Sequence, residues 1–286
     1  MTVTLRNLVS TLRLSGKRAL EWTADPPVGG RLTRPFYWTV APATFRRFSP
    51  TDFEDPAAAP DQFKIERVDP RRIRRFTPPR VYPPWHDRSA SFGRVEGGNW
   101  DWRPYDETPY HGGPPMDLFY ADRIEPGLLY QAIESHFIDG ISWEDTRFVQ
   151  RVIEYLDDGR EFVWRDCSSR ADVFARCRRL EDIHQSMRRH GCLSQRELTP
   201  PSRRVEGFLR FMQHEIVVDV GRNGDLLLVS GKHRYAIARA LRLDEISVTL
   251  LVRHAKWMDI RRELADGTDP ALRESVGDHP DLCDLV

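Results

Sequence analysis

A predicted β-hairpin that leads directly into a helix is the feature that most limits what this chain can fold into. Two apolar runs, residues 216–220 and 226–229, flank an Asn-Gly pair at 223–224. This pair favours a tight hairpin turn, because both residues adopt a positive φ at low cost. Residues 233–241 then have the apolar spacing of a helix, and residues 246–252 form a third apolar run. The pattern predicts a strand–strand–helix–strand unit.

Helical spacing of apolar residues predicts three more helices in the middle of the chain. They span residues 128–137, 144–156 and 172–190. Gly191 follows the last of them, at the position where a C-terminal cap belongs. The first hundred residues lack this regularity and are rich in proline and aromatic residues, so we expect them to be largely irregular.

One short segment of the N-terminal part is expected to be regular. Residues 63–68 alternate apolar and polar side chains as a strand does, and an Asp-Pro pair at 69–70 is typical of the start of a helical turn. Residues 92–110 predict a long loop, and the indoles of Trp100 and Trp102 favour an ordered one. We expect these indoles to pack under the loop, with stacking on a base or sugar as the alternative.

Composition and charge exclude some classes of protein. Residues 1–21 are amphipathic and basic but lack the continuous apolar core of a signal peptide, so we expect a surface helix there. No apolar run approaches the roughly twenty residues of a membrane span. The 43 basic and 43 acidic residues balance, which gives no overall attraction to nucleic acid. The cysteines lack metal-binding spacing, and we expect reduced thiols in a cytoplasmic protein.

The turn after the predicted strand 226–229 has the composition of an anion site. It consists of Ser230, Gly231, Lys232, His233 and Arg234. The first amide groups of a helix have no partners within it and carry a positive partial charge. A glycine lets a ligand approach the backbone, and the three side chains after it can each carry a positive charge. The alternative is a solvated turn whose charges point into water, and the spacing is not that of a P-loop.

Together these segments resemble the ParB/sulfiredoxin superfamily. The resemblance rests on residues 179–195, on the hairpin, on the glycine–lysine–histidine–arginine box that opens a helix, and on the run at 245–248. Residues 65–70 are similar to an earlier strand of that family, which is also followed by Asp-Pro. In the family the box cradles the phosphate groups of a nucleotide. The resemblance therefore implies a phosphate-binding role for the residues from Ser230 to Arg234.

Three branches of the superfamily can be compared with the box. Sulfiredoxins carry a cysteine where this chain has Lys232, which argues against their chemistry. ParB partition proteins carry a glutamate there and a DNA-reading helix-turn-helix, for which the segment after His254 is too short. Free-serine kinases have a Gly-His-His-Arg type of box, to which the box of this chain is similar.

The resemblance to these kinases implies a phosphotransferase that uses ATP or CTP with Mg²⁺ on a small hydroxylated acceptor. Such a reaction needs a carboxylate that receives the proton of the acceptor, and Glu66 and Asp69 are the candidate catalytic residues. Either can equally be a surface acid, and Asp69 a helix cap. The alternative function is a non-catalytic module that senses a nucleotide or binds nucleic acid without sequence specificity. A nuclease is disfavoured, because no carboxylate cluster suits two metal ions.

The expected fold is α+β, a small mixed sheet flanked by helices in the ParB/sulfiredoxin manner. Residues 1–62 would form an irregular arm rich in proline and tryptophan, and residues 63–254 the domain. A helical insertion at about 77–170 would interrupt that domain. Residues 255–286 would form an acidic C-terminal tail.

Overall fold

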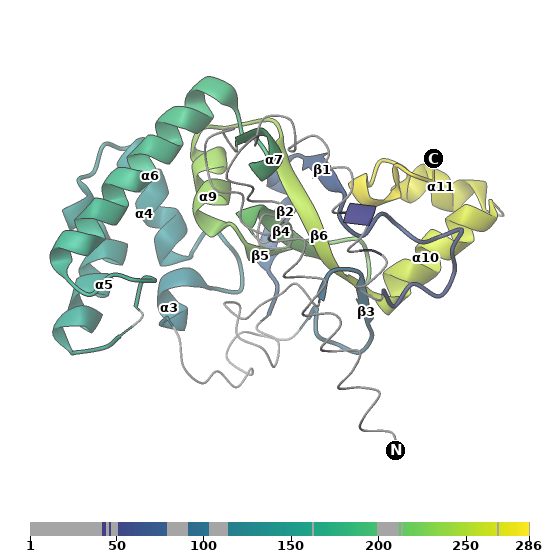
Figure 1. Ribbon diagram of the computed structural model, residues 1–286, viewed down its shortest axis with the longest axis horizontal. Helices are drawn as coiled ribbons and strands as arrows, with labels where there is room; N and C mark the ends of the chain where they lie inside the picture. The colour runs from purple at the N-terminus through teal and green to yellow at the C-terminus, as the bar shows by residue number, and fades with distance from the viewer. Residues whose placement is uncertain are drawn as a thin grey trace, which may run out of the picture.

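The computed structural model describes residues 42–43, 46, 51–78, 91–102, 114–161, 163–198, 212, 214–267 and 269–285. The amphipathic segment 1–21 and most of the expected N-terminal arm lie outside these residues. The described part is a mixed α+β structure with an open six-stranded sheet and eight helices (Figure 1). None of these helices is long and apolar enough to cross a membrane.

The sheet is mixed, and the strands of the predicted hairpin lie in its centre. Its order is β1 (Ile65–Val68), β6 (Ile246–His254), β4 (Ile216–Val220), β5 (Leu226–Ser230) and β2 (Ile73–Phe76), with β3 (Arg94–Glu96) beside the end of β6. The pairs β4–β5 and β1–β6 are antiparallel, whereas β4–β6, β2–β5 and β3–β6 are parallel. The strands predicted from the sequence are confirmed, each to within about two residues.

The two edge strands β1 and β2 are joined by only four residues, although they lie on opposite edges of the sheet. Asp69 and the 3-10 helix η1 (Pro70–Arg72) make this crossing. A 3-10 helix advances only about 2 Å per residue, whereas five flat strands would hold their edges about 19 Å apart. The sheet must therefore curve so that its edges approach each other, and the helix α9 (Lys232–Ala240) packs against the crossing.

Alternating residues of the strands serve two separate hydrophobic cores. In β4, Ile216 and Val218 belong to the larger core, which is shared with the helices. Val217 points to the other face, where it meets Leu227, Phe63 and Phe92. Because both faces are covered, the side chains of β4 and β6 are buried along their whole length.

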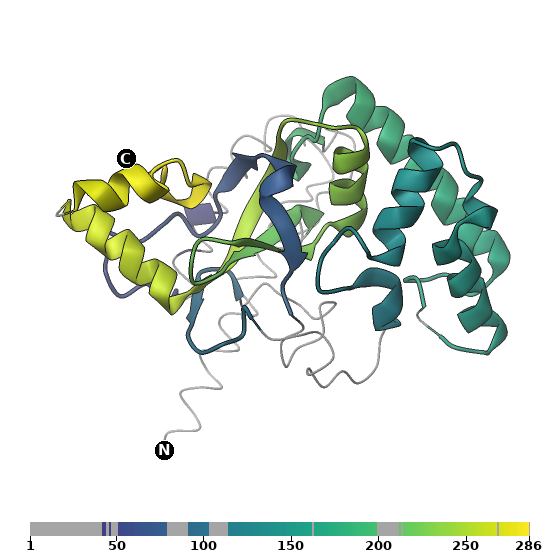
Figure 2. The same ribbon diagram turned by 180° about the vertical axis from the view of Figure 1, so that it is seen from behind.

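The helices form two groups at opposite ends of the sheet (Figures 1 and 2). One group lies next to α9 and comprises α3 (Met116–Phe119), α4 (Leu128–Phe137), α5 (Arg147–Asp157) and α6 (Arg170–His190), with the short α7 (Gln195–Leu198) after it. These elements confirm the helices predicted in the middle of the chain. The helix expected at 144–156 begins at Arg147, because η3 (Trp143–Asp145) precedes it and Thr146 caps it.

The other group is the C-terminal segment, expected as an acidic tail, which the structure shows folded. It comprises α10 (Ala255–Asp266), α11 (Pro270–Val276) and η4 (Pro280–Leu282). Asp281 is 3% exposed and accepts hydrogen bonds from Arg253 of β6 and from Trp257 of α10. Arg261, fully buried, donates to the carbonyl of Asp281 and to the side chain of Asp284. These charged contacts fasten the C-terminal turn to the sheet.

The segment expected as a loop at 92–110 contains the strand β3, and it is ordered where the structure describes it, up to Trp102. Trp100 is 9% exposed, packs in the smaller core and donates its indole N–H to the carbonyl of Glu96. Trp102 is 56% exposed, and the guanidinium of Arg222 lies 4.2 Å above its ring. The expected packing role is thus met by Trp100 alone.

Candidate phosphate-binding site

The box forms the turn between a central strand and a helix, as its sequence predicts. β5 ends at Ser230, Gly231 adopts a left-handed conformation with φ of +79°, and α9 begins at Lys232. None of the residues in the first turn of α9 is acidic. The first amide groups of the helix therefore lie at a turn with positive character.

Packing alone accounts for the glycine of the box. A Cβ at residue 231 would lie 2.8 Å from the Cα of Ile216 and 3.2 Å from the carbonyl oxygen of Glu215. Both the positive φ and this close approach of β5 to β4 demand a glycine. Gly231 therefore shapes the turn, and its presence does not by itself indicate a ligand.

His233 turns inward and is held as a neutral acceptor. Its ring packs on that of Trp164, with the centroids 5.9 Å apart, and its Nε2 accepts a hydrogen bond of 3.1 Å from the indole N–H. Burial, with the positive charges of Arg176, Arg165 and Lys232, lowers the pKa of His233 well below its ordinary value of 6.5. At neutral pH this side chain contributes no positive charge to the box.

Arg234 also serves the interior of the protein. Its guanidinium donates to the carbonyl oxygens of Leu193 and His214 and lies 3.5 Å from the carboxylate of Glu215. These contacts join the start of α9 to the segments that precede α7 and β4. The three basic side chains of the box therefore contact different elements, and they do not converge on one point.

Lys232 is the cation of the box that lies against an aromatic wall. Its ammonium is 3.8 Å from the ring centre of Tyr120 and 5.8 Å from that of Phe76. It also borders a small cavity of about 10 Å³, room for one water molecule, together with Tyr130 and Tyr235. Lys232 is also the first residue of α9. The hydroxyl oxygen of Ser230 is buried without a hydrogen-bond partner among the described residues.

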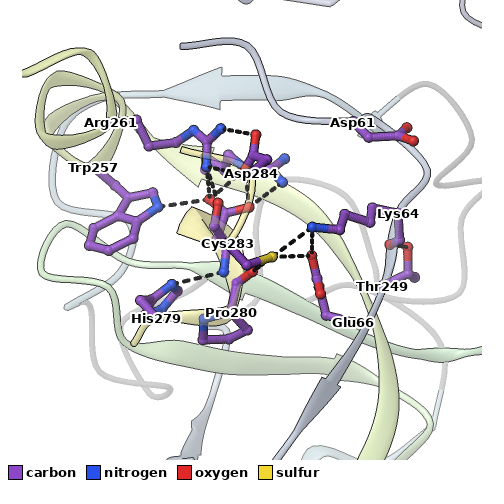
Figure 3. A network of polar contacts seen from close by, with 12 residues as sticks. Asp61, Lys64, Glu66, Thr249, Trp257, Arg261, His279, Pro280, Cys283 and Asp284 are labelled. Atoms are coloured by element: carbon purple, nitrogen blue, oxygen red, sulfur yellow. Dashed lines mark hydrogen bonds and ion pairs between the residues drawn. The ribbon is translucent and has the colours of Figure 1, made fainter. Parts of the chain in front are cut away.

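The two carboxylates predicted as catalytic lie away from the box. Glu66, on the edge strand β1, pairs with Lys64 over 2.6 Å and accepts from the thiol of Cys283 at 3.4 Å, as Figure 3 shows. Asp69 caps η1, and its hydrogen bond with Arg71 lowers the pKa of its carboxyl. This capping is the structural alternative foreseen for Asp69. Neither side chain contacts the residues of the box.

The structure places the carboxylate of Glu215 beside the box, next to Arg234. Glu215 was not predicted as a site residue from the sequence. It is 1% exposed, its Oε1 accepts from the backbone amide of Gln195, and its Oε2 has no hydrogen bond among the described residues. Burial raises the pKa of Glu215 to about 7, against the opposing effect of Arg234. The signal available in the sequence was an acid directly before the predicted strand 216–220.

The described residues near the box do not form a binding site for Mg²⁺. No group of three or more metal-ligating side chains gathers in this part of the chain. Glu215, the nearest carboxylate, is ion-paired with Arg234, whose charge opposes a second cation. The residues described do not fit the metal that the resemblance implies.

Comparison of the chain with models of known protein families, with curated proteins and with solved structures gave no match.

Proposed function

We propose that this chain binds a nucleotide, with the phosphate groups at the first turn of α9 beside Lys232. The observation that carries the proposal is how this nine-residue helix begins. Gly231 has no side chain with which to cap the first amide groups, and Lys232 adds a positive charge at the same turn. The amide groups at a helix start, the helix dipole and a lysine are together the usual components of a phosphate site.

Four other described helices begin with a side-chain cap, whereas α4, like α9, begins after a glycine without one. Thr146, Ser169, His254 and Asp269 each accept a hydrogen bond from a first-turn amide of the helix that they cap. The acceptor that these caps supply is missing from the glycine at the start of α9. Phosphate oxygens are suitable acceptors for that position.

The order of elements supports a fold of the ParB/sulfiredoxin type as part of the proposal. The strand β1 with its Asp-Pro turn, the long helix α6, the β4–β5 hairpin, α9 and β6 follow one another as the resemblance implies. In such a fold the box is the place where a nucleotide would lie. Either ATP or CTP suits a site that grips phosphate and leaves the base to other residues.

Binding without phosphoryl transfer is the form of the proposal that the geometry favours. Glu66 and Asp69 are engaged with Lys64 and Arg71, away from the box. Glu215 has a pKa suited to accepting a proton, but it is 1% exposed and paired with Arg234. We therefore propose the non-catalytic alternative, a nucleotide-binding module. Faster nucleotide turnover on addition of serine or another small hydroxylated acceptor would contradict this form of the proposal.

Thermal unfolding with ATP, ADP, CTP and GTP tests the proposal, with and without Mg²⁺. A ligand that binds the folded state raises the melting temperature by mass action. Lys232→Gln removes the lysine of the box. Lys256→Gln is the matched control, because Lys256 lies in the first turn of α10, whose cap His254 accepts its amide.

A rise in melting temperature with at least one nucleotide is expected in the wild type and in Lys256→Gln, and its loss in Lys232→Gln. A rise that survives in Lys232→Gln, or no rise with any nucleotide in the wild type, would overturn the proposal. Arg234→Ala is unsuitable for this test, because it also leaves Glu215 buried without its ion pair.

A further inference from the structure

One cysteine of the C-terminal segment lies against a lysine that directly precedes the first strand of the sheet. The Nζ atom of Lys64 lies 2.7 Å from the Sγ atom of Cys283, the residue after η4 (Figure 3). The two residues are 219 positions apart in the sequence. Cys283 is exposed, whereas the other three cysteines of the chain are buried. A small oxidant in solution therefore reaches this sulfur more readily than the others.

Glu66 completes a group of three reactive side chains. Its Oε1 lies 2.6 Å from the Nζ of Lys64 and 3.4 Å from the Sγ of Cys283. The ammonium is thus nearer to the sulfur than the carboxylate is, and a cation beside a thiol favours the thiolate. The thiolate is the form that peroxides oxidise. The group therefore holds an oxidisable sulfur, a nitrogen and a proton acceptor in mutual contact.

The backbone on both sides of this contact is fixed by other interactions. The carbonyl of Lys64 accepts a hydrogen bond of 3.3 Å from the hydroxyl of Thr249 in β6. On the other side, the buried Asp281 lies two residues before Cys283 and accepts hydrogen bonds from Arg253 of β6. The fold itself therefore brings the nitrogen and the sulfur together.

We propose that Lys64 and Cys283 form a modification site, at which hydrogen peroxide produces a covalent link between the sulfur and the lysine nitrogen. In the first step the peroxide transfers one oxygen atom to the sulfur, which becomes a sulfenic acid, and the rest of the peroxide leaves as water. In the second step the Nζ atom attacks the sulfur, so that the S–N bond forms and the S–O bond breaks. Sulfenic acids condense with a backbone nitrogen in the same way.

The protons of the second step balance through Glu66. Burial lowers the pKa of Lys64, but the hydrogen bonds with Cys283 and Glu66 raise it by more, so that the pKa lies above its ordinary value of 10.5. The nitrogen is therefore an ammonium before the reaction and loses two protons in it. One goes to the carboxylate of Glu66, and the other goes to the departing hydroxide, which leaves as water.

The link would fasten the C-terminal segment to the edge of the sheet. It would close a loop of chain between residues 64 and 283, and a cross-link of this kind restricts the unfolded chain. The ion pair of Asp281 with Arg253 holds the same turn without a covalent bond. This inference does not depend on the nucleotide-binding function proposed above.

Mass spectrometry of the full chain after treatment with hydrogen peroxide tests the inference. The link lowers the mass of the chain by two hydrogen atoms and joins two peptides after proteolytic digestion. Lys64→Arg keeps a positive charge beside Glu66 but removes the amine. Lys256→Arg is the matched control, because Lys256 is an exposed lysine on α10. Dimedone, added with the peroxide, labels any sulfenic acid that has not condensed.

The wild type and Lys256→Arg should yield a cross-linked peptide pair that contains Lys64 and Cys283. Dithiothreitol should separate this pair, because one of its thiols attacks the sulfur and releases the nitrogen, and its second thiol then frees the cysteine. Lys64→Arg should yield no such pair, and dimedone should label Cys283 in this variant more strongly than in the wild type. Glu66→Gln should slow the appearance of the pair.

Equal labelling of Cys283 by dimedone in the wild type and in Lys64→Arg, with no cross-linked pair in either, would overturn the inference. The absence of any oxidation at Cys283 would overturn it as well. An unchanged rate in Glu66→Gln would overturn the proton transfer to Glu66. None of these results bears on nucleotide binding, which the thermal unfolding of Lys232→Gln tests separately.

Discussion

The hydroxyl of Tyr235 lies 3.1 Å from the carbonyl oxygen of Pro70, at the point where the chain crosses from β1 to β2. The same hydroxyl contacts the carbonyl of Ile73 and accepts a hydrogen bond of 2.9 Å from Arg239. One fully buried side chain of α9 thus ties the helix to both ends of η1. The contact sets where α9 lies within the curved sheet, and with it the position of the box one turn earlier.

Replacing Tyr235 with phenylalanine should destabilise the fold by about 1–3 kcal/mol, because buried carbonyls lose their donor. Urea unfolding of the wild type and the variant measures this loss. Tyr130→Phe is the matched control, since Tyr130 is a buried tyrosine on the adjoining helix α4 for which no described hydroxyl bond exists. Equal losses in the two variants would contradict the role assigned to the Tyr235 contact.

Glu215 should make the stability depend on pH. Its pKa is about 7 in the folded chain against an ordinary value of 4.5, so between these values the folded chain holds the extra proton. Its contribution therefore falls as the pH rises through this window, by about 3 kcal/mol in total. Glu215→Gln removes the titration and keeps an acceptor for the amide of Gln195.

Unfolding free energies of the wild type and Glu215→Gln at several pH values between 4.5 and 8 check this sign. The variant should gain stability relative to the wild type as the pH rises, because the other titrating groups are common to both proteins. A constant difference across the window would show that the carboxyl of Glu215 titrates alike in the folded and unfolded chain.

Asp281 should be essential for the docking of the C-terminal segment. Asp281→Asn leaves the buried guanidinium of Arg253 without its counter-charge, and a broken buried pair costs about 3–5 kcal/mol. Limited proteolysis should then cut the segment after residue 266 sooner than in the wild type. Asp259→Asn, which breaks an exposed pair with Arg262, should have little effect. Similar cleavage rates for the Asp281 variant and the wild type would refute this role.

Local patterns predicted the elements that depend on local sequence. The helix at 128–137, the Asn-Gly hairpin and the strand–box–helix turn follow from periodicity and from turn residues, and the structure has all three. The sequence allowed two roles for Asp69, a catalytic acid or a helix cap. Its hydrogen bond from the backbone amide of Arg71 gives it the geometry of a cap. No local signal indicated that β1 and β2 lie on opposite edges, since this depends on how the sheet curves around Tyr235.

The side chains of the candidate site were less predictable, because long-range packing decides where they point. His233 is neutral since Trp164, far away in sequence, covers and binds it. Arg234 is occupied by Glu215 and by the carbonyl of Leu193. Sequence reasoning identified the turn, whereas the structure indicates which of its neighbours face it.

The most direct test of the central claim is an NMR titration that follows the backbone amide signals as ATP or CTP is added. Binding at the first turn of α9 predicts saturable shifts that are largest for the amides of residues 231–234. The amide of Lys256, at the capped start of α10, should remain unshifted as an internal reference. Saturable shifts confined to other parts of the chain, or none with either nucleotide, would contradict the claim that this turn is the phosphate site.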